Sequence, residues 1–358
     1  MAYVPALKAR EAEIKAVNRA PTTLQLTPLF ELQRAGQATV DPLSGVRRRG
    51  KSTTTDASYF LDDIARLWYD PLYADISRVA DTSNRAAWWR LLDSLNALAS
   101  VPAELIPVLI PSDSAAVLSA AAGVASQTGR AALRVPMQEA RSAPAALASA
   151  PQTVAKGVGV PVTSVDVILD WADGMEASVI PLDTLVNDTK AVIAALGGQH
   201  GSLITLGTPE SSAFQQVGDW QPVRREWWLW LRLAHEGFDV VYGDYALYPP
   251  SDPVPASPRY GHLRYSSGDR MHVHRRAVPS TGGGLAAAFK VCCDHLVTQS
   301  HWLGAGLSRA DQRLDDIAAN SDKESQPGNW RQLAAEHHFA LVADQLANPP
   351  AAPAPGTP

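Results

Sequence analysis

The sequence predicts an α/β fold, a (β/α)8 TIM-type barrel that carries a C-terminal hairpin and a helical extension. The length of 358 residues suits one barrel domain with appendages. Short apolar segments rich in β-branched residues alternate along the chain with longer segments of helical periodicity. Eight such apolar segments occur in series, and this repetition favours a closed parallel barrel over an open sheet.

The predicted strands and helices follow one another regularly along most of the chain. Strands are expected at residues 3–8, 26–30, 72–76, 105–109, 132–135, 165–169, 202–206 and 239–242. Helices are expected at residues 11–19, 85–99, 114–126, 182–196 and 224–235. Thr82 and Ser83 are candidate N-caps, and Gly197, Gly198 and Gly237 suit the left-handed position that ends a helix. Residues 140–160, rich in Ala, Ser and Pro, form either a loose helix or a linker.

The chain is expected to divide into a barrel at residues 1–250 and a second part at residues 251–347 that packs on it. In the second part, HLRYSSGDRMHVHRR indicates two short strands around Ser267 and Gly268. Helices are predicted at residues 285–299 and 330–346, with a polar loop near Gly328. The proline-rich tail, residues 348–358, is expected to be disordered.

The net charge of −5 provides no general attraction to nucleic acid, because non-specific affinity for a polyanion comes mainly from basic residues. Arg47, Arg48, Arg49 and Lys51 are a local exception. They form either a solvated basic loop or a contact for an anion or nucleic acid.

The sequence indicates a cytoplasmic protein that does not associate with a membrane. The N-terminus lacks the apolar core of a secretory signal, and no apolar run approaches the roughly 18 residues of a membrane-spanning helix. Cys292 and Cys293 are adjacent, a poor placement for a disulfide. Helical tryptophans are expected to pack on the outside of the barrel, with a partner surface as the alternative. These are Trp88, Trp89, Trp227, Trp228 and Trp230.

Charged residues stand at or just beyond the ends of the predicted strands, where barrel proteins carry their functional groups. Because side chains alternate along a strand, Lys8, Asp170 and Asp244 each share a face with residues of their own strand. If these faces point inward, the three side chains converge on one mouth of the barrel. Further charged residues near strand ends are Arg10, Glu31, Asp75, Arg78 and Arg134.

Carboxylates that lie beside Lys and Arg can transfer protons, hold a divalent cation or bind an anion. They can equally form salt bridges that close the rim of the barrel. Under the enzyme hypothesis, the catalytic residues are Lys8, Glu31, Asp170 and Asp244. The residues assigned to ligand binding at this mouth are Arg10, Asp75 and Arg134.

The histidines of the C-terminal part allow two interpretations. His272 and His274 alternate on one strand face, and an H-x-H pair can supply two metal ligands, with a third from the C-terminal helix. They can equally be partly exposed strand residues, and His337 and His338 cannot both face one side of a helix. No residue is therefore assigned as a metal ligand, whether a metal is bound stays open, and no cofactor is identified.

Several familiar catalytic motifs are missing from the sequence, including G-x-G-x-x-G, the P-loop, H-E-x-x-H, G-x-S-x-G and C-x-x-C. The run TPESS at residues 208–212 follows a predicted strand. It either caps a helix or presents backbone N–H groups to an anion.

Six segments, in their order along the chain, resemble the family named after the bacteriophage beta protein, which also has members in bacterial chromosomes. They are YVPALKAREAE, LTPLFEL, VVYGDYALYPP, HLRYSSGDRMHVHRR, SHWLGAGLSRADQRLDDIA and GNWRQLAAEHHFALVADQL. The chain departs from the family pattern at His272 and His274, where aromatic or aliphatic residues are expected, and just before His337. The resemblance points to Lys8, Arg10, Glu13, Glu31, Gly243, Asp244, Tyr245, Arg264, Tyr265, Asp269, Trp330, His337 and His338.

The resemblance adds Tyr245, Arg264 and Tyr265 to the predicted ligand-binding set, although Arg264, Tyr265 and Asp269 can also simply stabilise the hairpin. Two functions stay open. The first is a binding or sensor protein, part of a phage-defence system, with a protein partner encoded nearby or an anionic small molecule as ligand. The second is a TIM-barrel hydrolase or lyase that acts on a phosphate-bearing or carbohydrate-like small molecule. Fold analogy cannot choose between them, because barrels host unrelated functions.

Overall fold

The structure is a computed structural model that describes residues 2–32, 60–62, 64, 68, 70–77, 84–99, 102–175, 180–208, 217–246, 260–280 and 282–356. Several predicted features lie outside these residues: the basic segment at 47–51, the candidate caps Thr82 and Ser83, Arg78, and residues 209–212.

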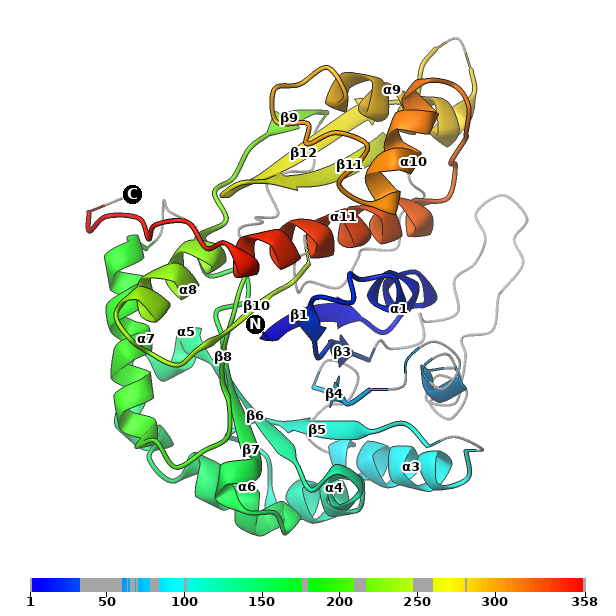
Figure 1. The fold of residues 1–358 in the computed structure, drawn as a ribbon. Helices are drawn as coiled ribbons and strands as arrows, with labels where there is room; N and C mark the ends of the chain where they lie inside the picture. The colour runs from blue at the N-terminus through cyan, green and yellow to red at the C-terminus, as the bar shows by residue number, and fades with distance from the viewer. Residues whose placement is uncertain are drawn as a thin grey trace.

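Eight parallel strand positions close into a barrel, which confirms the predicted fold class (Figure 1). Strand β10 pairs with both β8 and β1, so the sheet has no open edge. Strands β2 and β3 are consecutive short segments that both pair with β1 and share one position. The strands are β1 (Ala2–Lys8), β2 (Gln25–Leu26), β3 (Leu29–Glu31), β4 (Leu72–Asp75), β5 (Leu105–Leu109), β6 (Ala131–Pro136), β7 (Val165–Asp170), β8 (Leu203–Leu206) and β10 (Val241–Asp244).

Helices connect most strands and surround the barrel, because parallel strands require a crossover between them. Their ends follow local rules: Ser114 accepts a hydrogen bond from the Val117 N–H, and Gly197 and Gly237 adopt positive φ, as predicted. Residues 140–160 contain a 3-10 turn, Pro144–Leu147, and a regular helix. The helices are α1 (Glu11–Asn18), α3 (Arg85–Ala97), α4 (Ala115–Thr128), α5 (Met137–Ala140), α6 (Ala150–Val158), α7 (Leu182–Leu196) and α8 (Arg225–His235).

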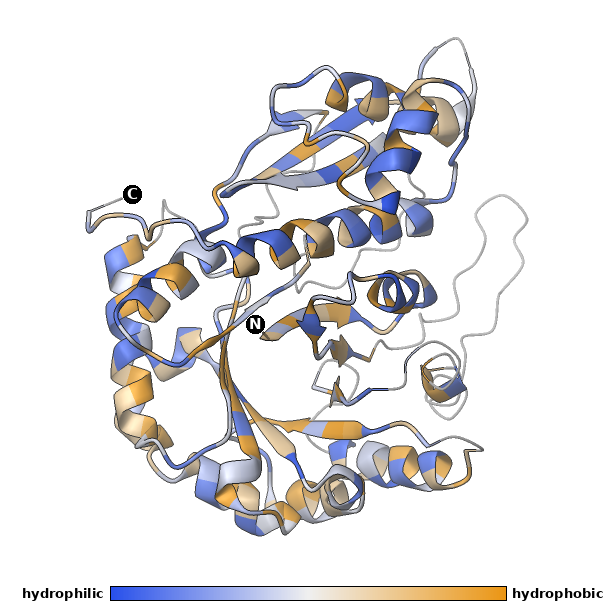
Figure 2. Ribbon diagram, in the orientation of Figure 1, coloured by the Kyte–Doolittle hydropathy of each residue, from blue (hydrophilic) through white to orange (hydrophobic). Residues whose placement is uncertain are grey.

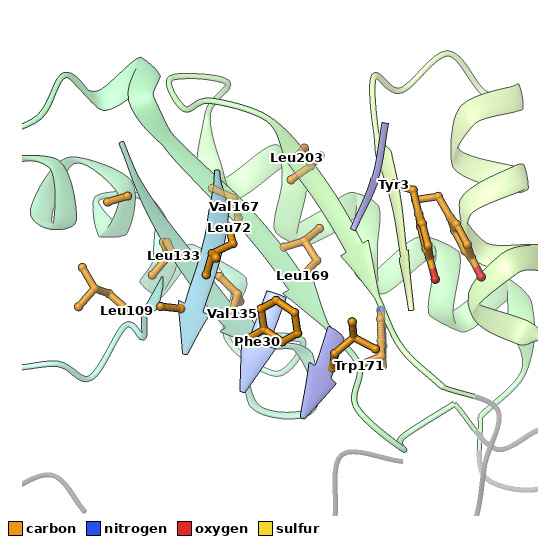
Figure 3. Close-up of a cluster of buried hydrophobic side chains, with 14 of the residues drawn as sticks. Tyr3, Phe30, Leu72, Leu109, Leu133, Val135, Val167, Leu169, Trp171 and Leu203 are labelled. Atoms are coloured by element: carbon orange, nitrogen blue, oxygen red, sulfur yellow. The ribbon is translucent and has the colours of Figure 1, made fainter. Parts of the chain in front are cut away.

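Two apolar layers follow from the alternation of side chains along the strands. The smaller layer fills the inside of the barrel and includes Val4, Ile106 and Ile168. The larger layer joins the outer strand faces to the helices; Figure 3 shows part of it, with Leu133 and Val167 from neighbouring strands. Figure 2 shows the apolar colour concentrated along the barrel strands, whereas the surrounding helices also carry polar residues.

The tryptophans of α3 and α8 pack in the outer layer, as predicted. Trp89 and Trp227 are fully buried, and Trp227 stacks on Trp230 with ring centroids 4.9 Å apart. Trp88 is buried as well, and Trp228 packs against the same cluster. Their large apolar rings thus stabilise the contact between helices and barrel.

A second sheet lies beyond the barrel, formed by β11 (Tyr260–Ser267), β12 (Arg270–Ala277) and β9 (Gly218–Trp220). The antiparallel pair β11–β12 turns at Gly268, which confirms the predicted hairpin. Strand β9 was not predicted, and it pairs with the outer side of β12. Helices α9 (Gly284–Leu296) and α10 (Arg309–Ala318) enclose an apolar core with this sheet. Helix α10 was also not predicted.

Helix α11 (Pro327–Ala347) joins the two parts of the molecule (Figure 1). Trp330 and Leu333, near its start, belong to the core of the second sheet. Phe339 and Val342, in its second half, belong to the outer layer of the barrel. Helix α11 therefore completes the ring of helices after β10, and at the same time carries the second sheet.

The segment after α11 runs back along the barrel helices. The Gly356 N–H donates to the Asp183 carboxylate of α7 over 2.9 Å. The predicted domain boundaries and disordered tail stay predictions. Among the described helices, none combines the length and the apolar character that crossing a membrane requires.

Candidate functional site

The described residues place five ionisable side chains together at the C-terminal ends of the barrel strands, a group called here the mouth cluster: Lys8, Glu31, Asp75, Arg134 and Asp170. Four of them are the last residues of β1, β3, β4 and β7, and Arg134 reaches the same level from within β6. All five are buried; Lys8 and Asp170 keep the largest exposed fraction, 7% each. Parallel strands all end at this face, where barrel proteins hold their ligands.

Arg134 is the centre of the mouth cluster. Its guanidinium contacts Glu31 Oε1 at 2.9 Å and Asp170 Oδ2 at 2.7 Å, and it also bonds to Asp75 Oδ2. Burial disfavours the charged guanidinium, but Asp170, Tyr245, Asp75 and Glu31 outweigh this effect and hold the pKa of Arg134 well above its ordinary value. Arg134 is therefore a permanent cation shared by three carboxylates.

Lys8 and Tyr245 complete the cluster. Lys8 Nζ lies 2.5 Å from Glu31 Oε2, so Glu31 bridges the two cations. Tyr245, just after β10, donates its hydroxyl to Asp170 at 2.9 Å and also contacts Arg134. Two cations and three carboxylates leave the five charged groups with one net negative charge. The structure thus brings together six predicted site residues that are far apart in the sequence.

The sequence model of one protein family, described as Beta protein, matches residues 3–344. This range covers the barrel, the second sheet and almost all of α11. The chain belongs to the Beta protein family. No curated protein matches the chain. The resemblance inferred from the six segments is confirmed, and the roles of individual residues in this Beta protein family member rest on the geometry.

A second polar group lies at the opposite end of the barrel interior of this Beta protein family member. Tyr73 donates to Asp166 Oδ2 over 2.9 Å, and Arg130 Nη2 lies 2.7 Å from the same oxygen. Asp166 stands near the start of β7, whereas Asp170 ends it. The two ends of the barrel therefore carry comparable tyrosine–carboxylate–arginine contacts, and the opposite end provides matched controls for the mouth.

The prediction that Asp244 shares the mouth with Lys8 and Asp170 is wrong. Tyr242 packs in the outer layer, with its ring centroid 5.5 Å from that of Tyr3, and Asp244, two residues on, faces the same way. The inward residue at this level is Tyr245. The alternation itself is correct, but a shift of one residue moves every side chain of a strand to the opposite face.

Asp244 instead accepts hydrogen bonds between the barrel and α11. The hydroxyls of Tyr3 and Tyr242 lie 2.6 Å from its two oxygens, and His338 Nε2 lies 2.7 Å away. Burial opposes ionisation of Asp244, but His338, Arg224 and the Tyr242 hydrogen bond outweigh it and hold the pKa of Asp244 below its ordinary value. Asp244 is therefore an anion buried in the fold.

His338 extends this network to the second sheet, because its Nδ1 lies 2.9 Å from Ser266 Oγ. The order Ser266, His338, Asp244 resembles a nucleophile–base–acid arrangement. However, Ser266 is 0% exposed and lies under the second sheet's own packing. A nucleophile must reach its substrate, so these residues form a structural link between barrel, helix and hairpin.

The other predicted ligand-binding residues do not join the mouth cluster. Tyr265 donates to Asp311 over 3.0 Å and stacks on His337, inside the second part of the molecule. Arg264 is buried on β11. Arg10 lies just before α1, at the edge of the mouth, and acts on Glu13 electrostatically. Among these three residues, Arg10 is the one next to the mouth cluster in the sequence, two residues after Lys8.

Glu13 stands among the positions that the resemblance indicates, but not in the predicted catalytic or ligand-binding set. It lies in the first turn of α1, is 3% exposed, and its Oε2 has no hydrogen-bond partner among the described residues. Burial raises the pKa of Glu13 to about 7, although Arg10, Arg331 and Lys8 oppose the shift. A carboxyl group that titrates near neutral pH beside charged strand ends is suited to proton transfer.

Glu13→Gln is expected to remove part of the pH dependence of stability. The folded pKa is raised, so the folded state holds the proton more tightly, and stability is lost as pH rises from about 4.5 to about 7. The variant should therefore gain stability above pH 7, on the order of 3 kcal/mol, and little below pH 4.5. Urea unfolding across this range measures the difference. Glu11→Gln, at an exposed position of the same helix, should retain the wild-type profile; parallel profiles for wild type and Glu13→Gln would contradict the assignment.

Proposed function

We propose that the barrel mouth binds a small, polyhydroxylated, carbohydrate-like molecule, and that the chain acts as a binding or sensor protein. The observation that carries the proposal is the mouth cluster: five charged side chains from five strands, joined through Arg134 at the C-terminal barrel face. Such a ring is held in place by strands rather than by loops, so its hydrogen-bonding groups are preorganised.

The charge of the cluster favours a neutral ligand over a phosphate. The five charged groups sum to one negative charge, which repels a strongly anionic group placed against Glu31 or Asp170. A carboxylate has about four lone-pair sites, and Asp75, which accepts from Arg134 and from the Ser77 N–H, can accept further hydroxyl groups. Lys8 brings ammonium donors to the same place. Hydroxyl groups, which both donate and accept, match this mixture of charged donors and acceptors.

Tyr245→Phe tests the proposal, with Tyr73→Phe as its matched control. Each change removes one buried tyrosine hydroxyl that contacts an aspartate and an arginine, at opposite ends of the barrel. The purified proteins are melted with a panel of neutral sugars, polyols, sugar phosphates and nucleotides. A ligand present at 100 times its Kd stabilises the folded state by about 2.7 kcal/mol. We expect a neutral sugar or polyol to raise the Tm of wild type and Tyr73→Phe, and to lose this effect in Tyr245→Phe.

Other outcomes decide against the proposal in distinct ways. A hit confined to sugar phosphates would replace the neutral ligand by the anionic small molecule. A hit that survives in Tyr245→Phe would move the site away from the mouth. If nothing in the panel binds, the hypothesis of a protein partner encoded nearby, with its role in phage defence, takes the place of the small-molecule sensor.

The second candidate is a hydrolase or lyase, and one observation favours it: Glu13, a buried carboxyl group with a pKa of about 7, lies near Lys8 and Glu31. In that case Glu13 would exchange a proton with the substrate while the mouth cluster holds it. A panel hit that is converted by the wild type, and bound without conversion by Glu13→Gln, would favour the enzyme over the sensor.

A further inference from the structure

Four histidines and one aspartate gather on the second sheet, well away from the mouth cluster. His272 and His274 lie on β12, Asp219 on β9, His295 on α9, and His301 just after α9. Asp219, His274 and His295 each offer one ligand atom, and these atoms lie within 4.8 Å of one another. His301 Nε2 faces His274 Nε2 at 3.4 Å.

We propose that His274, His295 and His301 bind a divalent transition-metal ion of the zinc class, with Asp219 orienting His274. Zinc–nitrogen bonds of about 2.0–2.1 Å in a tetrahedron place neighbouring nitrogens about 3.4 Å apart. The His274–His301 nitrogen distance of 3.4 Å fits this edge.

The hydrogen bonds around His274 leave the correct nitrogen for a metal. His274 Nδ1 lies 2.7 Å from Asp219 Oδ1, which fixes the proton on Nδ1 and directs the Nε2 lone pair toward His301. A carboxylate behind a metal-binding histidine is the usual second partner in such sites. Arg276 also contacts Asp219, at 2.8 Å, so this carboxylate serves as the support of His274 rather than as a direct ligand.

The neighbouring rings hold the imidazoles in place. His272 stacks on His301 with ring centroids 3.5 Å apart, and its own Nδ1 is buried without a hydrogen-bond partner among the described residues.

His295 is the ligand that must move most. Its ring lies 5.0 Å from that of His274, centroid to centroid, and its side chain is 32% exposed. One ligand atom of His295 lies within 4.8 Å of one on His274, and its Nε2 lies 3.5 Å from Asp219 Oδ2. A side-chain rotation on α9, from Asp219 toward the Nε2 edge of His274, is therefore part of the proposal. His337 and His338 take no part, since Asp311 and Asp244 hold them inside the molecule.

Metal binding by the full chain tests this proposal independently of the proposed function. The protein is stripped with a chelator, dialysed against Zn2+, and analysed for bound metal; Co2+ then reports the geometry through its visible absorption. We expect one equivalent of metal, a strong visible band for tetrahedral cobalt, and a Tm raised by Zn2+. His301→Gln and His295→Asn should each weaken the affinity at least tenfold.

Two control variants separate the outcomes. His200→Gln changes a histidine just before β8 whose Nδ1 lies 2.8 Å from the Gly201 carbonyl oxygen, and this variant should bind metal like the wild type. Tyr245→Phe should also keep its metal, so a failed mouth proposal leaves this one unaffected. Less than one equivalent of bound Zn2+ in the wild type, or unchanged affinity in both His301→Gln and His295→Asn, would overturn the site. Because His295 and His301 are partly exposed, their replacement is compatible with folding, which circular dichroism verifies.

Discussion

Asp244→Ala is expected to destabilise the fold by about 3–5 kcal/mol, the range found when one partner of a buried ionic group is removed. The change leaves the hydroxyls of Tyr3 and Tyr242 without their acceptor and deprives His338 of its carboxylate. It also leaves Arg224, 4.0 Å away, with less compensating charge. Equilibrium unfolding in urea measures the loss.

Asp239→Ala is the matched control, because Asp239 is an exposed carboxylate just before the same strand. It should change stability by no more than about 0.5 kcal/mol. Asp244→Asn should fall between the two, since its amide keeps one acceptor but presents a donor to the second hydroxyl. An Asp244→Ala variant as stable as Asp239→Ala would show that the buried network contributes nothing net to folding.

Arg134→Met is expected to have the largest effect of any substitution at the mouth. It retains the volume of an unbranched side chain but leaves Glu31, Asp75 and Asp170 buried without their shared cation. Breaking one buried ion pair costs about 3–5 kcal/mol, so loss of the cation from three carboxylates should cost at least that much. We expect the variant to be partly unfolded at neutral pH and to regain stability as the pH falls, because protonation removes the repulsion among the carboxylates.

Arg130→Met provides the comparison at the other end of the barrel. Arg130 contacts one carboxylate, Asp166, and its side chain is 36% exposed, so solvent compensates for much of the loss. The expected cost is about 1 kcal/mol, without recovery in acid. If Arg134→Met and Arg130→Met had equal stability at neutral pH, the mouth cluster would be a set of independent, weak contacts.

The strands were predictable because each carries a compact apolar segment that both layers of the barrel require. Residues 105–109 and 165–169, for example, agree with β5 and β7 to within one residue. The charged residues at the strand ends were equally visible, and Lys8, Glu31, Asp75, Arg134 and Asp170 meet as the alternation of side chains implies. To place these side chains at the mouth, it was only necessary to know which face of each strand points into the barrel.

For β10, the wrong face was predicted to point inward. Alternation has the same appearance on both faces, and Gly243 carries no side chain to mark the inner one. Tyr242 lies outside because Tyr3 and Trp227 provide aromatic surfaces for it there. Those partners come from opposite ends of the barrel sequence, so no local pattern could have placed Asp244 against α11.

The second sheet was only partly predictable for a related reason. Strand β9 has three residues and lacks apolar alternation; its position depends on pairing with β12. The H-x-H pair on β12 was noticed, but the histidines of the last helix, suggested as one source of a third ligand, contact Asp311 and Asp244 instead. His295 and His301 approach His274 through the packing of α9 on the sheet, which only the three-dimensional structure reveals. The sequence left open whether a metal is bound, and this question is still untested.

Helix α11 belongs to the core of the second sheet and to the outer layer of the barrel, and this affects how the protein folds during synthesis. The helix that closes the ring around β10 and β1 follows the whole second sheet in the sequence. Until the ribosome has made α11, the ring of Tyr3 lacks the side chain of Phe339 that packs against it. The first strands of the barrel therefore keep apolar surface exposed until α11 has been synthesised, and we expect a chain truncated before α11 to be bound by chaperones or degraded rather than to fold as a smaller barrel.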